Sequence, residues 1–85
     1  VSDDEIIYAY KLLSAKEGVF CEPASAASLA GVIKMYKKGV FKNSDTIVCT
    51  LTGHGLKDTD TAIKSSDKPI TVPSELNEVV KAFGF

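Results

Sequence analysis

Residues that could take part in chemistry lie in two short stretches of the chain. The first, Thr52 to Gly55, places a hydroxyl, a histidine and two glycines directly after the almost unbroken apolar run at 47–51. The second is Glu22, which follows the apolar run at 19–21. In open α/β sheets, ligands bind just beyond the carboxyl ends of the strands, and glycines let a ligand approach the backbone. Thr52 is therefore the first candidate for a ligand-binding residue, and Glu22 is the second.

Both candidates have structural alternatives. The Thr52 hydroxyl is suited to capping the turn that it begins, as threonine hydroxyls often do. The Glu22 carboxylate would be favoured at the start of a helix beginning at residue 24 or 25, because the amino end of a helix is positive. His54 is interpreted as a polar turn residue, with a general acid or base role as the alternative.

The small residues around the two candidates are interpreted as structural. Gly53 and Gly55 are expected to shape the turn, since one G-x-G lacks the rest of a phosphate-binding fingerprint. Ser25 and Ser28 are expected to be helix-start and packing residues rather than ligands.

Composition and charge narrow the classes of partner. Ten basic and eleven acidic residues give a formal net charge of −1, which offers no basic surface to a nucleic acid or an anionic membrane. No apolar run approaches the roughly 18 residues that span a bilayer. Cys21 and Cys49 lie far apart without CxxC spacing, which indicates free thiols and a cytoplasmic protein. The single histidine does not supply a metal site.

The amino-terminal third predicts two helices. Ser2 and Glu5 form the S-x-x-E capping box of a first helix that ends near residues 15–17, before Gly18. A short strand at 19–21 stops at Pro23. A second helix, from residue 24 or 25 to 38, begins with small side chains that permit close packing, and Gly39 ends it.

The order strand, helix, strand predicts a right-handed parallel crossover, which sets Glu22 and Thr52 at one crevice. Residues 59–68 read as polar and turn-rich, and 70–72 as a short extended segment. Ser74 is expected to cap a last amphipathic helix that packs on the sheet. The expected fold is one α/β domain over residues 1–85, with three αβα layers, a short mainly parallel sheet, and a tail at 65–85 that contains the terminal helix. Two or three strands are too few for a stable parallel sheet. The sequence therefore indicates that these residues are a portion of a protein with a wider sheet.

Two motifs carry a resemblance to a known family. EPASAAS at 22–28 and LTGHGLKD at 51–58, introduced by VSDDEI and GVFC, resemble the C-terminal part of the threonine synthases. These are pyridoxal-phosphate enzymes related to the tryptophan synthase β subunit, with the fold called type II. The resemblance covers residues 1–64, and both motifs occur in the matching order.

The resemblance implies a reaction in which O-phospho-L-homoserine and water give L-threonine and phosphate. It also implies cofactor-binding roles. Thr52 matches the hydroxyl residue that faces the pyridine nitrogen of pyridoxal phosphate, and Glu22 matches an acidic residue near the cofactor ring. A neutral hydroxyl there leaves the nitrogen largely unprotonated, whereas an aspartate would keep it protonated.

The departures from the family pattern are equally informative. The serine-and-lysine motif that forms the Schiff base and the glycine- and asparagine-rich phosphate loop do not occur in this chain, so no residue is assigned catalysis. The chain alone is expected to be inactive and to have the remainder of the enzyme as its partner. Two alternatives remain open: a free-standing small α/β module that binds a phosphorylated metabolite or nucleotide, and an interaction domain that pairs through a sheet edge.

Overall fold

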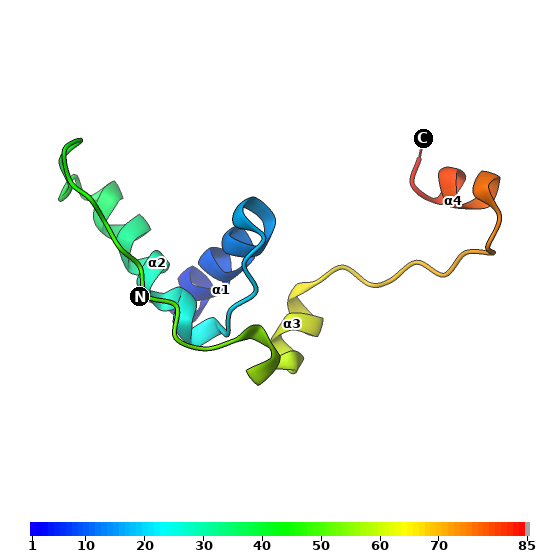
Figure 1. The fold of residues 1–85 in the computed structure, drawn as a ribbon, viewed down its shortest axis with the longest axis horizontal. Coiled ribbons are helices and arrows are strands. Elements are labelled where there is room, and N and C mark those ends of the chain that lie inside the picture. Colours follow the sequence, from blue (N-terminus) through cyan, green and yellow to red (C-terminus); the bar gives the residue numbers. More distant parts are fainter. Residues whose placement is uncertain (85) are drawn as a thin grey trace.

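A computed structural model describes residues 1–84 and shows a helical chain (Figure 1). Its α-helices are α1 (Asp3–Leu12), α2 (Pro23–Lys37), α3 (Thr59–Ser65) and α4 (Leu76–Ala82). A single π-helical turn, η1 (Leu13–Glu17), continues α1, and a short 3-10 turn, η2 (Gly55–Lys57), precedes α3.

The predicted three-layer αβα fold with a mainly parallel sheet is wrong for this chain. Between residues 1 and 84 the structure has no strand, and the segments at 19–21, 47–51 and 70–72 form no ladder. One isolated bridge joins Cys21 to His54, and it is antiparallel rather than parallel. A strand needs neighbours to pair its backbone groups, and the apolar run that was expected to be a buried strand is open to solvent, with Val48 84% exposed.

The first helix begins as its sequence predicts. The Ser2 hydroxyl accepts from the Glu5 N–H at 3.2 Å, and the Glu5 carboxylate accepts from the Ser2 N–H at 2.9 Å. This reciprocal pair satisfies two amides that the helix leaves without partners. Gly18 ends the element in the left-handed conformation, with φ of 66°. The capping box and the stop at Gly18 are thus confirmed.

The second helix starts at Pro23, one or two residues earlier than the predicted start at residue 24 or 25. Proline is favoured in the first helical turn because its fixed φ suits the helix and its missing N–H is not needed there. Glu22 is the residue before the helix but makes no capping hydrogen bond with its side chain. Gly39, with φ of 71°, follows the helix end.

The core lies between α1 and α2 and is built mostly from small side chains, with Tyr10 as the one large buried residue of the described chain. Its buried residues are Ala9, Tyr10, Cys21, Ala26 and Ala30, with no large side chain fully buried in the described chain. The alanines allow the two helices to pack closely, as the small residues of α2 predicted. Leu51 packs against this core from the loop that leads to Thr52.

The C-terminal third extends away from this core (Figure 1). Residues 59–65 form α3, a helix that the sequence analysis did not predict. The Asp58 carboxylate caps this helix by accepting from the Thr61 N–H at 3.1 Å. The predicted Ser74 cap is wrong: α4 begins after Glu75, without a side-chain cap. Nor does α4 pack on a sheet, and Leu76 is 77% exposed.

The overall dimensions follow from this arrangement. The radius of gyration is 17.0 Å, whereas a compact domain of this length has about 12 Å. The accessible surface is 6803 Å², against about 4900 Å² for a compact protein of this mass. The chain therefore leaves much apolar surface without an internal partner.

Candidate functional site

The two stretches that carry the predicted site residues meet at one junction. The Glu22 N–H donates to the Gly53 carbonyl at 3.0 Å, and the Gly55 N–H donates to the Phe20 carbonyl at 3.0 Å. Residues 20–22 and 53–55 thus lie side by side in opposite directions. Glu22 lies next to Gly53, the residue that follows Thr52. The sequence analysis expected Glu22 and Thr52 to be close because of a parallel crossover, but the two segments are antiparallel.

Ser25 holds the Thr52 loop in place. Its hydroxyl oxygen accepts from the Gly53 N–H at 2.8 Å and from the Thr52 N–H at 3.2 Å. It also lies 3.3 Å from the Thr52 hydroxyl oxygen. Ser25 is 4% exposed, whereas Thr52 is exposed. A buried residue in the first turn of α2 therefore fixes the backbone of an exposed one.

A second serine supports the same loop. The Ser28 hydroxyl lies 3.1 Å from the Ser25 carbonyl and 3.4 Å from the Thr50 carbonyl, and donates toward both. Ser25 and Ser28 are thus at the helix start and packed, as predicted. No local pattern singles out Ser25 as the support of Thr52, because the two residues are 27 positions apart.

The Glu22 side chain lies over Gly53. A β-carbon added at Gly53 would overlap the Glu22 carboxylate, so this position requires glycine if Glu22 keeps its place. Glu22 is half-buried. Its carboxylate is therefore held against the backbone of the residue that follows Thr52.

Gly55 is required for a different close approach. A β-carbon there would overlap the ring of Phe20. That ring also packs edge to face against His54, with centroids 5.7 Å apart. The His54 Nδ1 accepts from the Leu56 N–H at 3.1 Å, and His54 begins the 3-10 turn η2. The structure thus shows His54 as a polar turn residue.

Burial controls the ionisation of two groups in the core next to the junction. Burial raises the pKa of the Cys21 thiol. Burial also raises the pKa of the Tyr10 hydroxyl, with smaller contributions from the Asp58 and Cys21 charges. Both groups are thereby kept neutral and are poor nucleophiles. Cys21 and Cys49 are free, as the sequence predicted.

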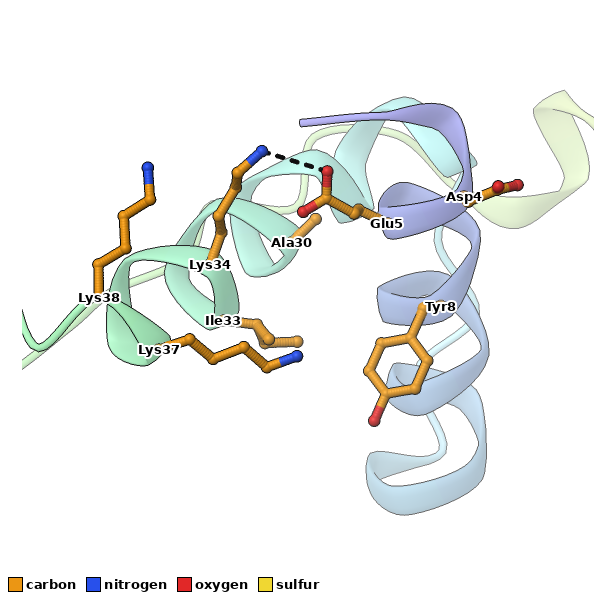
Figure 2. Close-up of a pocket in the computed structure, with 8 residues that line it drawn as sticks. All are labelled: Asp4, Glu5, Tyr8, Ala30, Ile33, Lys34, Lys37 and Lys38. Atoms are coloured by element: carbon orange, nitrogen blue, oxygen red, sulfur yellow. Dashed lines mark hydrogen bonds and ion pairs between the residues drawn. The ribbon is translucent and has the colours of Figure 1, made fainter.

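A separate cavity of about 390 Å³ lies between α1 and α2 (Figure 2). The Lys34 ammonium and the Glu5 carboxylate form an ion pair of 3.3 Å beside it. Lys37 extends into the space between the helices, while Lys38 points away. Neither Thr52 nor Glu22 lines this cavity, so it is distinct from the predicted site.

The junction offers chemistry that suits one side of an aromatic cofactor. Thr52 presents a neutral hydroxyl on a backbone fixed by Ser25, and Glu22 presents a carboxylate beside it. A hydroxyl pairs with a ring nitrogen without a charge of its own. The residues present therefore fit the ring-nitrogen side of pyridoxal phosphate.

None of the α-helices in residues 1–84 is both long and apolar enough to cross a membrane.

Comparison with known proteins places the chain in a family. The family model described as pyridoxal-phosphate dependent enzyme matches residues 1–53. The chain therefore belongs to the pyridoxal-phosphate dependent enzymes, and pyridoxal phosphate is the cofactor of that class.

Individual relatives narrow the similarity. The chain is 51% identical over 77 residues to a threonine synthase of Methanocaldococcus jannaschii, covering 91% of this chain and 19% of that protein. It is 53% identical over 81 residues to a threonine synthase of a Bacillus species, covering 95% and 23%. With a threonine synthase of Synechocystis it shares 49% over 87 residues, covering 100% and 22%.

These matches confirm the resemblance that the two motifs carry. The chain spans about a fifth of the length of these relatives.

Proposed function

We propose that this chain is the C-terminal portion of a threonine synthase, an enzyme that converts O-phospho-L-homoserine and water to L-threonine and phosphate. The observation that carries the proposal is the junction at which EPASAAS and LTGHGLKD, the two motifs of the resemblance, are hydrogen-bonded to each other. The identity of 49–53% to threonine synthases supports it.

Thr52 faces the pyridine nitrogen of the cofactor in this proposal. When bound, pyridoxal phosphate supplies an electron sink for bond-breaking at the substrate amino acid. The neutral Thr52 hydroxyl leaves the ring nitrogen largely unprotonated and so moderates that sink. Glu22, held over Gly53, places its carboxylate near the ring and orders the water around it.

The remaining machinery belongs to another part of the enzyme. The chain has neither the serine-and-lysine motif nor the glycine- and asparagine-rich loop of the family, and Lys34 is paired with Glu5 at a different site. The extended shape and the exposed apolar run around Val48 favour docking into a wider sheet. The isolated chain is therefore expected to be inactive.

Substitution of Thr52 in the full-length protein that carries this chain tests the assignment. Thr52→Val keeps the shape and removes the hydrogen bond, so the cofactor dissociation constant should rise roughly fivefold to tenfold, as for one lost hydrogen bond. Thr52→Ser is the matched control and should stay close to the wild type. The measurements are cofactor titration by absorbance and the formation of threonine from O-phospho-L-homoserine.

Two results would contradict the proposal. The first is a Thr52→Val variant that binds the cofactor and reacts like the wild type. The second is a wild-type enzyme that releases no threonine from O-phospho-L-homoserine. Titrating the isolated chain with pyridoxal phosphate tests the inactivity, since a saturable imine band would show that a lysine of this chain holds the cofactor.

A further inference from the structure

We infer that Ser25 is a positioning residue that makes the Thr52 hydroxyl a hydrogen-bond donor toward the cofactor ring. The hydroxyl oxygens of Ser25 and Thr52 lie 3.3 Å apart, and from that distance alone either hydroxyl could be the donor. The surrounding hydrogen bonds decide the direction.

The acceptor capacity of Ser25 is already filled. A serine hydroxyl has one proton to donate and two lone pairs to accept. Both lone pairs of the Ser25 oxygen are used by backbone donors, the Gly53 N–H at 2.8 Å and the Thr52 N–H at 3.2 Å. No lone pair is left to accept from the Thr52 hydroxyl. The Ser25 proton must therefore point to Thr52, and the Thr52 oxygen accepts it.

This direction leaves the proton of the Thr52 hydroxyl available for another acceptor. With its oxygen accepting from Ser25, its own proton turns to another acceptor. The bond to Ser25 is the one that the structure gives the Thr52 hydroxyl within residues 1–84, and Thr52 is exposed. Thr52 is thus prepared to donate to a neutral acceptor such as an unprotonated aromatic nitrogen.

Burial makes the arrangement persistent. Ser25 is 4% exposed, so water does not compete for its lone pairs. Its backbone is held in the first turn of α2, where the Ser25 N–H donates to the Glu22 carbonyl at 3.0 Å. Ser28 binds the Ser25 carbonyl from the next turn. The donor direction is therefore set by the folded chain before any ligand arrives.

The inference rests on the proposed role of Thr52, and one part of its test needs no cofactor. In the full-length apo-protein, Ser25→Ala removes the acceptor of two amides, so hydrogen exchange at Thr52 and Gly53 should accelerate roughly fivefold to tenfold. Ser28→Ala is the matched control, because it lies on the same helix and contacts the same loop at Thr50. Ser28 accepts from neither amide, so its loss should accelerate exchange at Thr52 and Gly53 clearly less than the loss of Ser25 does. Equal exchange in the two variants would overturn the inference.

The second part reads the ring nitrogen directly. With pyridoxal phosphate labelled with nitrogen-15 in the ring, the nitrogen resonance of the holoenzyme should shift in Ser25→Ala in the same direction as in Thr52→Val, and by clearly less in Ser28→Ala. If Thr52→Val shifts the resonance and Ser25→Ala does not, Thr52 keeps its role and the inference about Ser25 is wrong. If Thr52→Val leaves it unchanged, the proposed function itself fails.

Discussion

Gly55→Ala should loosen the junction between the two motifs. The β-carbon of an alanine at this buried position would overlap the Phe20 ring, which would have to give up its edge-to-face packing against His54 to make room. Overpacking of this kind costs about 1 to 3 kcal/mol. The expected effect is local, because the Glu22 N–H and the Gly53 carbonyl next to it close the same junction.

Hydrogen exchange at the Glu22 amide in the full-length protein measures that loosening. A cost of about 1 to 3 kcal/mol corresponds to exchange roughly five to 140 times faster. The matched control is Gly31→Ala, since a β-carbon at Gly31 meets nothing within 4 Å. Alanine inside a helix is favoured over glycine by about 1 kcal/mol, so this control should not destabilise the protein.

A double-mutant cycle identifies the cause. In a Phe20→Ala background the ring is gone while the Phe20 carbonyl still accepts from residue 55, so most of the cost of Gly55→Ala should disappear. The reasoning is refuted if Gly55→Ala exchanges like Gly31→Ala. It is also refuted if the acceleration persists undiminished without the Phe20 ring.

Three further substitutions have distinct expected outcomes. Gly53→Ala should lower the free energy of unfolding by less than about 1 kcal/mol in a urea titration, because the flexible Glu22 side chain can move aside. The same substitution should weaken cofactor binding, measured by absorbance titration, because it displaces the Glu22 carboxylate. Hydrogen bonds from Ser2, and to a smaller extent from Lys34, lower the pKa of Glu5 from 4.5 to about 2. The Glu5 carboxylate therefore stabilises the fold above pH 4.5, and this contribution is lost as the pH falls from 4.5 to 2. Glu5→Gln should accordingly flatten the dependence of the urea midpoint on pH in that interval. Asp58→Ala removes the cap of α3 and should destabilise that helix by about 1 kcal/mol, seen as faster amide exchange within residues 61–65, whereas unchanged exchange would contradict the capping role.

Signals that act between near neighbours were sufficient to predict the helical elements around the site. The capping box of Ser2 and Glu5 and the stops at Gly18 and Gly39 depend on residues within one turn, so the sequence contains the whole cause. The cap at Asp58 belongs to the same class and was recognisable from Asp58 and Thr61, but the polar composition around it was interpreted as a turn.

Pairing between distant segments could not be predicted in the same way. The run at 47–51 has the composition of a buried strand, yet a strand exists only when neighbouring strands pair with its backbone, and residues 1–84 supply none. The expected fold class therefore failed where it depended on partners outside the local sequence. The sequence analysis expected Glu22 and Thr52 at one crevice because of a parallel crossover, whereas an antiparallel bridge brings Glu22 beside Gly53.

The sequence by itself determined α1 and α2, the two motifs and the residue types at their tips, since these follow from local propensity and from the chemistry of each side chain. Only the tertiary structure decided that Ser25 would accept the amides of Thr52 and Gly53, and that Gly53 and Gly55 would admit Glu22 and the Phe20 ring. These contacts join residues some 27 to 35 positions apart. Nothing in the local pattern specifies them, because each depends on how α2 and the loop after Leu51 meet in space.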